Sequence, residues 1–209
     1  PLLETLKTHW KEVLIAIGGK VVETAPFYIF GTFIISYATN NLGFESTKPL
    51  NAVTVATIVT TILIPIMGRF SDQVGRKPLY NWGAILMAVF AFPYFWLLEL
   101  KTDLALYAAT IIGLGIIWAP ITAVLGTMFS EIFQSKVRYT GVSLGYQIGA
   151  ALAGGTAPFI ATLLLTTFNQ SYVPVAIYII FASLISLISV MFVREKKKTV
   201  AKKDDAVNV

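Results

Sequence analysis

The chain has 209 residues, of which 56% are hydrophobic and only 13% are charged, and its formal net charge is +5. A soluble domain usually carries about 25% charged residues, so this composition excludes a protein whose whole surface faces water. With no cysteine and a single histidine, His9, the sequence excludes a thiolate or histidine metal centre. No catalytic cluster or phosphate-binding loop points to an enzyme or to a cofactor.

Six apolar blocks are each long enough for a helix that crosses the hydrocarbon core of a bilayer, which takes about 20 residues. Strands are excluded, because membrane strands are about 9–11 residues long and alternate polar with apolar side chains. In chain order, the predicted spans cover residues 13–38, 50–67, 79–98, 104–129, 141–166 and 172–193. The predicted fold is therefore all-α, a polytopic six-helix transmembrane bundle over residues 1–193, with a charged tail over residues 194–209.

Basic residues divide unequally between the two sets of connections. One set and the tail contain Lys7, Lys11, Arg69, Arg76, Lys77, Lys136, Arg138 and the basic residues from Arg194 onward, whereas the other set contains only Lys48 and Lys101. Short connections rich in Lys and Arg stay in the cytoplasm, so both termini are expected there, as an even number of spans requires. Positive charge with this distribution indicates orientation in the plasma (inner) membrane and not a nucleic-acid-binding face.

The first span contains two ionisable residues. Lys20 and Glu23 are three positions apart, which places both on one helix face, where they can pair. A charge inside a membrane costs about 2.5–3.5 kcal/mol or more, so such residues usually face the bundle interior and serve a function. We expect this pair to act in proton coupling or solute binding, with a purely structural ion pair as the alternative.

The connection between the second and third spans reads GRFSDQVGRKP from Gly68 to Pro78. Gly68 would let one helix end approach another closely, and Gly75 would permit a turn with positive φ. Asp72 offers an acceptor to helix N-termini or to an arginine, and Arg76 and Lys77 would hold this connection in the cytoplasm.

Weaker candidates for the lining of a central cavity are Tyr28 in the first span, Trp118 in the fourth, and Tyr146 and Gln147 in the fifth. Aromatic residues in membrane helices serve more often as packing residues or interface anchors. A mid-span amide needs hydrogen-bond partners, so Gln147 is expected to face protein or water and not lipid.

The fifth span also contains glycines at four-residue spacing, Gly141, Gly145 and Gly149. Small residues on one stripe allow another helix to approach closely, so this stripe predicts tight packing. Gly154 and Gly155, which follow, would loosen the helix and allow it to bend.

The Gly68–Pro78 connection resembles the signature of the major facilitator superfamily, to which Gly68, Asp72, Gly75, Arg76 and Lys77 correspond. Gln73 stands where the family usually has a basic residue, and a generic positively charged connection is the alternative interpretation. Glu131 and Arg138, with six residues between them, resemble the Glu-x6-Arg element of the corresponding later loop. The resemblance implies a cytoplasmic network of Asp72, Arg76, Glu131 and Arg138 that steadies one conformation, which we call the latch.

Residues 129–161 are similar to the metabolite:proton symporter branch of this family, which includes proline/betaine, shikimate, citrate and alpha-ketoglutarate carriers. The similarity covers spans seven to twelve of such a transporter. It therefore implies a fragment that lacks its N-terminal six-helix half, with a small organic solute and protons as partners. A non-transporting six-helix membrane subunit and a half-size homodimeric transporter remain the alternatives.

Overall fold

The computed structural model describes residues 2–193, with side chains from Thr5 onward, so the expected tail over residues 194–209 lies outside the described residues. A short helix, α1 (Leu2–Thr8), precedes six helices that are long and apolar enough to cross a membrane. No strand occurs among the described residues, so the prediction of an all-α six-helix membrane bundle is confirmed.

Three spans are uninterrupted α-helices and three contain a wider π-helical segment. The uninterrupted spans are the second, α4 (Thr47–Val74), the third, α5 (Arg76–Glu99), and the sixth, α10 (Val173–Met191). The first span joins α2 (Trp10–Tyr28), η1 (Ile29–Phe33) and α3 (Ile34–Asn40), and the fourth joins α6 (Asp103–Thr110), η2 (Ile111–Ile117) and α7 (Trp118–Ile132). The fifth joins α8 (Arg138–Gly149), η3 (Ala150–Gly154) and α9 (Ala157–Thr167).

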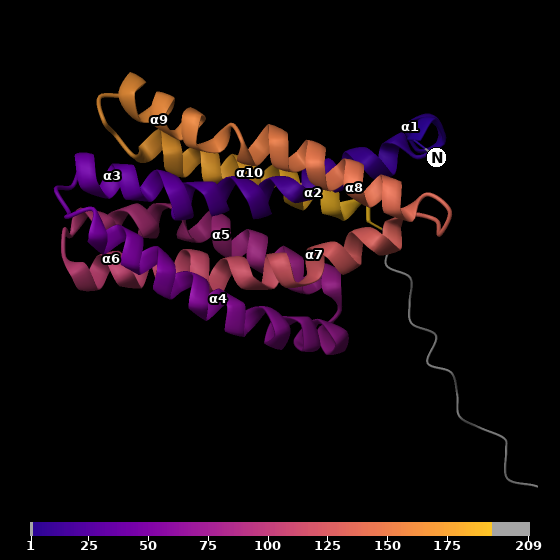
Figure 1. The fold of residues 1–209 in the computed structure, drawn as a ribbon, viewed down its shortest axis with the longest axis horizontal. Coiled ribbons are helices and arrows are strands. Elements are labelled where there is room, and N and C mark those ends of the chain that lie inside the picture. The colour runs from indigo at the N-terminus through magenta and orange to yellow at the C-terminus, as the bar shows by residue number, and fades with distance from the viewer. Residues whose placement is uncertain (1, 194–209) are drawn as a thin grey trace, which may run out of the picture.

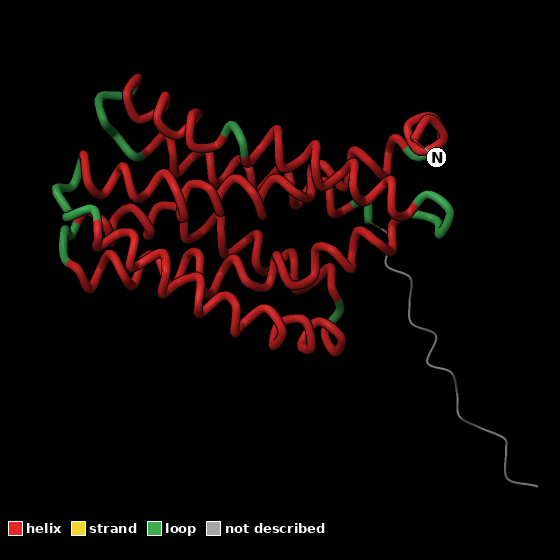
Figure 2. The backbone as a smooth tube through the Cα atoms, viewed as in Figure 1, coloured by secondary structure: helices red, strands yellow, loops and turns green. Residues whose placement is uncertain are grey.

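A turn at residues 155–156 separates η3 from α9 inside the fifth span, and Figure 2 shows it as a short loop between two helical stretches. This interruption lies where the sequence predicts a loosened helix. Segments of π-helix are often found at functional sites, and here they occur in the first, fourth and fifth spans.

The connection expected over residues 68–78 is almost entirely helical. Helix α4 continues to Val74, and only Gly75 separates it from α5. Gly75 has a φ of +96°, as the expected turn requires. At Gly68 an added Cβ would meet nothing within 4 Å, so the expectation of a close helix approach at Gly68 is wrong for the described part of the chain.

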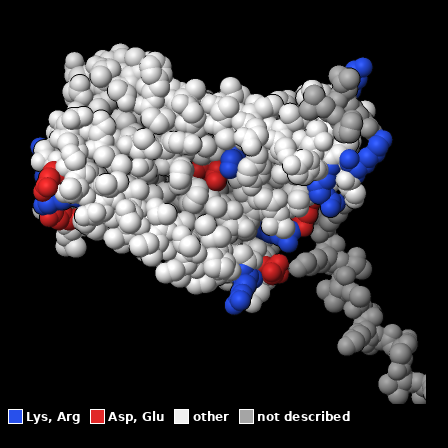
Figure 3. Space-filling view, viewed as in Figure 1, with Lys and Arg blue, Asp and Glu red and all other residues white. Residues whose placement is uncertain are grey.

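Charged side chains lie at the two ends of the bundle and are scarce between them. Figure 1 shows α1, the turn between α4 and α5, the turn between α7 and α8 and the end of α10 at one end of the molecule, which we call the N-terminal end. The opposite end carries the other three turns. Charged side chains gather at both ends of the face in Figure 3, and an almost uncharged surface separates them.

The first and fourth spans form the centre of the bundle. In the 18-residue apolar stretch of each span, 61% and 67% of the residues are buried in the first and fourth spans, against 17% in the second. Helix α2 packs against α8 and α10, while α7 packs against α4 and α5. The two central spans therefore hold the side chains that are best shielded from lipid.

Glycines bring α8 against α2, where the sequence predicts tight packing. A Cβ added at Gly145 would lie 2.4 Å from the Cβ of Ala16, and one at Gly149 would lie 2.7 Å from the Cβ of Lys20. Gly141 instead faces the ring of Phe133, just before its own helix. The glycine stripe thus places α8 directly against the part of α2 that carries Lys20.

Replacing Gly145 by alanine should destabilise the bundle. The new methyl group would lie far inside van der Waals contact with Ala16, and overpacking of this kind costs about 1–3 kcal/mol. We expect a lower midpoint of thermal unfolding for the protein purified in detergent. Gly31→Ala is the matched control, because a Cβ there meets nothing within 4 Å. Equal midpoints for the two variants would contradict the close α2–α8 contact.

Candidate functional site

An ion pair between two residues of the first span lies inside the bundle, where it faces the fourth span. The Lys20 Nζ is 2.5 Å from the Glu23 Oε2, and the two residues are only 8% and 9% exposed. In Figure 3 a group of red and blue atoms lies in the middle of an otherwise white face, far from the charges at the ends. Among the described residues, Lys20 and Glu23 are the only charged ones in the middle of a span, so the expected pair forms.

Hydroxyl groups complete the surroundings of the Glu23 carboxylate. The Thr24 hydroxyl oxygen lies 2.8 Å from Oε2, and the Thr122 hydroxyl of α7 donates to Oε1 at 3.3 Å. On the other side of the pair, the Lys20 Nζ lies over the Tyr146 ring, 4.1 Å from its centroid. A cation over an aromatic face is attracted by the electrons of the ring, so Lys20 has an anionic and an aromatic partner.

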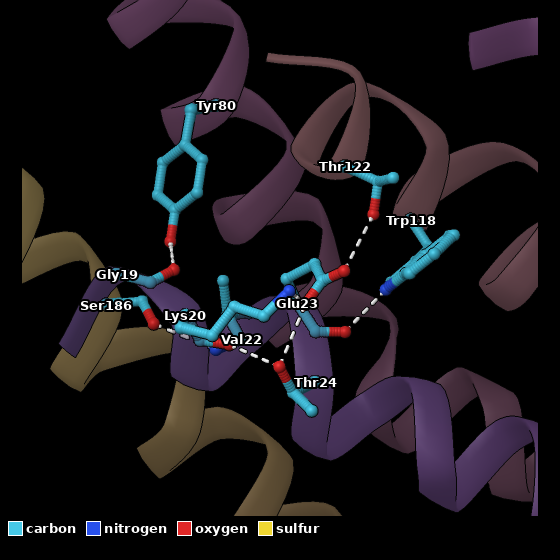
Figure 4. A network of polar contacts seen from close by, with 9 residues as sticks. All are labelled: Gly19, Lys20, Val22, Glu23, Thr24, Tyr80, Trp118, Thr122 and Ser186. Carbon is cyan, nitrogen blue, oxygen red and sulfur yellow. Dashed lines mark hydrogen bonds and ion pairs between the residues drawn. The ribbon is translucent and has the colours of Figure 1, made fainter. Parts of the chain in front are cut away.

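Side chains from three other helices bind the backbone of α2 around this pair, as Figure 4 shows. The Ser186 hydroxyl of α10 accepts from the Val22 N–H at 2.8 Å and donates to the Gly18 carbonyl at 2.7 Å, so it binds two backbone groups one turn apart on α2. Tyr80 of α5 donates to the Gly19 carbonyl, and the Trp118 indole of α7 donates to the Glu23 carbonyl. These bonds hold three neighbouring helices to the backbone of α2.

Aromatic rings lie next to Glu23 on the side away from Lys20. The Phe27 ring is 4.9 Å from that of Trp118 and 5.5 Å from that of Tyr28, measured between centroids. Phe27 and Tyr28 are more than a third exposed, whereas Trp118 is 8% exposed. Tyr146 thus lies beside the pair and Tyr28 lies beside Phe27, whereas Trp118 is buried and binds the Glu23 backbone.

Gln147 follows Tyr146 in α8 but makes no hydrogen bond to the ion pair. The residue is exposed on the surface of the bundle, and no side-chain hydrogen bond of its amide occurs within residues 2–193. The structure therefore does not bring Gln147 together with the other candidates.

The expected latch forms only in part. Arg76 pairs with Glu131 of α7 and lies 3.9 Å from Asp72 of α4. Lys77 donates to the Met191 and Val193 carbonyls at the end of α10, both at 2.9 Å. These contacts connect α4, α5, α7 and α10 at the N-terminal end of the bundle.

Arg138 lies outside this network. It begins α8, its side chain is exposed, and it forms no ion pair within the described part of the chain. Lys77, which belongs to the motif that the resemblance assigns to the latch, instead reaches the carbonyls at the end of α10.

Thr24, Thr122, Tyr80 and Ser186 contact the ion pair or its backbone but were not predicted from the sequence. Hydroxyl residues are common in membrane helices, and most of those here bond to their own helix, as Ser183 does to the Ile179 carbonyl. The only sequence signal was the position of Thr24 next to Glu23. Groups of three or more His, Cys, Asp or Glu side chains that could hold a metal ion do not occur among the described residues.

Comparisons with known proteins place the chain among membrane transporters. The Major Facilitator Superfamily profile matches residues 17–207. The chain is 29% identical over 198 residues to the shikimate transporter of Escherichia coli (strain K12), covering 95% of this chain and 45% of that protein. It is 26% identical over 219 residues to the ectoine/proline transporter ProP of Corynebacterium glutamicum, covering 100% and 42%.

A proline/betaine transporter of Salmonella typhimurium is 26% identical over 192 residues, covering 92% of this chain and 38% of that protein. The chain thus spans less than half the length of these curated relatives. No solved structure matches it significantly.

Replacing Ser186 by alanine should lower stability more than the same change at Ser183. Without the Ser186 hydroxyl, two buried hydrogen bonds between α10 and the backbone of α2 are lost, each worth about 0.5–1.5 kcal/mol. Ser183 is equally buried on the same helix, but its hydroxyl bonds only to its own backbone. Thermal unfolding of the two purified variants makes the comparison, and an equal or smaller loss for Ser186→Ala would contradict a stabilising contact between Ser186 and α2.

Proposed function

The chain belongs to the major facilitator superfamily, a family of membrane transporters and not of enzymes, and we propose that it forms the C-terminal half of a proton-coupled symporter for a small organic solute. The observation that carries this proposal is the Lys20–Glu23 pair, buried near the middle of the first span. The names of the relatives, which include transporters of shikimate, ectoine and proline, support a small polar solute.

The energetic cost of the pair supports a functional role. Ionised groups in a membrane are costly even when they are paired, and pairs that serve packing alone can be replaced by apolar residues without loss. Here side chains of three further helices hold the backbone that presents the pair. The number of contacts that hold this part of α2 favours a solute- or proton-binding role for Lys20 and Glu23 over a structural one.

A second six-helix bundle is proposed as the partner of the face in Figure 3. Helix α4 borders this face and is the least buried span, and its Thr54, Thr57 and Thr61 are exposed. The relatives are more than twice as long as the matched region, which leaves room for an N-terminal half. The solute would bind between the two halves near the midplane, and the halves would rock about it.

Orientation follows from charge. Seven described basic residues lie at the N-terminal end of the bundle, namely Lys7, Lys11, Arg69, Arg76, Lys77, Lys136 and Arg138. The opposite end has only Lys48 and Lys101. We propose that the N-terminal end faces the cytoplasm of a cell whose plasma membrane the protein spans several times.

The Arg76–Glu131 pair is proposed to steady one conformation of the transporter, with Asp72 and Lys77 in support. It joins the start of α5 to the end of α7, and Lys77 adds the end of α10. Ion pairs at a helix junction can be broken in one state and intact in another, which is how a latch acts.

Replacing Glu23 by glutamine should uncouple transport from protons. An amide cannot take up or release a proton, so in proteoliposomes containing the full-length protein, accumulation driven by a pH gradient should fall at least about tenfold. Exchange of labelled solute without a gradient should change less than about threefold, since no net proton movement is needed. The measurement is uptake of a panel of labelled carboxylates and betaines, with and without a pH gradient.

Glu99→Gln is the matched control, because Glu99 accepts a hydrogen bond from Tyr37 that an amide oxygen can still accept. Its accumulation should remain close to that of the unmodified protein. If a pH gradient still drives solute accumulation by Glu23→Gln, Glu23 does not carry the coupling proton.

Reversing either charge of the Arg76–Glu131 pair should slow transport, and reversing both charges in one variant should restore it. Arg76→Glu places a carboxylate beside Glu131, and Glu131→Arg places a second cation beside Arg76, so each single change replaces attraction by repulsion. The double variant restores an ion pair and should recover at least half of the lost rate. Arg69→Gln, an exposed basic residue nearby, is the control. A double variant as slow as the slower single variant would contradict the pairing.

A further inference from the structure

The Thr24 hydroxyl lies between two oxygen atoms to which it cannot donate at the same time. Its Oγ1 is 2.9 Å from the Lys20 carbonyl oxygen and 2.8 Å from the Glu23 Oε2 (Figure 4). A hydroxyl has one hydrogen to donate and lone pairs to accept with. Thr24 can therefore donate to a charged Glu23, or accept from a protonated Glu23 while donating to the Lys20 carbonyl.

The same carboxylate oxygen also holds the lysine. The Lys20 Nζ bonds to the Glu23 Oε2, while Thr122 holds the other oxygen, Oε1. If Lys20 turned to another anion, Oε2 would lose its cation but keep Thr24. A proton on Oε2 would then point at a hydroxyl that is already in place to accept it.

Lys20 is free to exchange its anion because its other neighbour is an aromatic face. An ammonium has three hydrogens, and the Tyr146 ring attracts the cation without binding it in a fixed direction. A carboxylate from a solute could take the position of the Glu23 carboxylate while Tyr146 keeps the ammonium where it is.

The charge balance of this region limits what can bind there. One cation and one anion occupy the described mid-membrane region, so its net charge is zero. An anion that binds alone would leave one uncompensated negative charge in a medium of low dielectric constant, which is costly. An anion that binds together with one proton leaves the net charge at zero.

We propose that the solute is a carboxylate monoanion that replaces Glu23 at the Lys20 ammonium, while Glu23 Oε2 takes up one proton and donates it in a hydrogen bond to Thr24. The proton comes from the aqueous phase and forms an O–H bond on Oε2, and no covalent bond of the solute changes. One anion and one proton then cross together without net charge. This inference rests on the proposed transport function and adds to it the class of solute, the proton stoichiometry and a positioning role for Thr24.

The other groups around Glu23 leave this exchange intact. Tyr80 of α5 and Tyr146 of α8 are further titratable side chains near Glu23. Both are phenols, which stay neutral across the physiological range. Helices α7 and α10 contribute Trp118, Thr122 and Ser186 there, none of which titrates. Among the contacts of Lys20 within the described residues, Glu23 is the group that can take up the proton.

Imposing a pH gradient and a membrane potential separately tests whether the solute crosses without net charge. Full-length protein in proteoliposomes is given labelled shikimate and benzoate as monoanions, and labelled proline and glycine betaine as zwitterions. A pH gradient and a potassium-diffusion potential are imposed one at a time. We expect a monoanion to accumulate with the pH gradient and to respond less than about twofold to the potential, since no net charge moves.

Uptake of a zwitterion alone, or uptake of an anion that the potential drives strongly, would overturn the inference while leaving proton-coupled transport in place. Uptake of no solute from a broad panel that also includes sugars and neutral compounds would overturn the proposed function itself.

Substitutions at Thr24 test the hydroxyl. Thr24→Val keeps the shape but gives a protonated Glu23 no hydrogen-bond partner, so accumulation and exchange of the monoanion at neutral pH should both fall at least about tenfold, and exchange should recover as the pH is lowered. Thr24→Ser retains the hydroxyl and should behave like the unmodified protein. Thr39→Val removes a hydroxyl that bonds only within its own helix and controls for stability.

A merely structural role of Thr24 would lower exchange equally at every pH. That result, or full coupling in Thr24→Val, would overturn the assignment of Thr24.

Discussion

Lipid offers no hydrogen bonds, and this constraint explains the arrangement at the centre of the bundle. Polar groups there must find their partners within the protein. The Ser186 hydroxyl binds two backbone groups of α2, Tyr80 and Trp118 bind carbonyls of the same helix, and the two charges neutralise each other. The most polar part of the bundle is consequently also a part where several helices meet.

The same constraint explains which features the sequence could predict. Long apolar stretches and loop charges are one-dimensional signals, so the six spans and the pairing of Lys20 with Glu23 could be predicted from the order of the residues alone. The positive φ of Gly75 followed from its place in a tight turn. These predictions needed no knowledge of which helices are neighbours.

Contacts between spans could not be predicted in this way. Ser186 is 164 positions from Val22 in the sequence, and nothing in the local pattern distinguishes it from Ser183, which bonds to its own helix. Arg138 fits the family spacing but lies exposed, whereas Lys77 reaches the end of α10. The expected close approach at Gly68 fails for the same reason, because only the packing of the helices shows what lies beside a residue.

The π-helical segments share one location relative to the ion pair. The segments η1 and η3 follow Glu23 and Tyr146 in the chain, while η2 precedes Trp118 in a span of opposite direction, so all three lie on the side away from the N-terminal end. Each wide turn holds an extra residue, which shifts the angular position of everything after it by roughly 100° relative to an ideal α-helix. A helical wheel drawn through the whole of the first, fourth or fifth span would therefore put residues beyond the wide turn on the wrong face. Probes intended for the half of the bundle away from the N-terminal end must be placed by counting from η1, η2 or η3 and not from the ion pair.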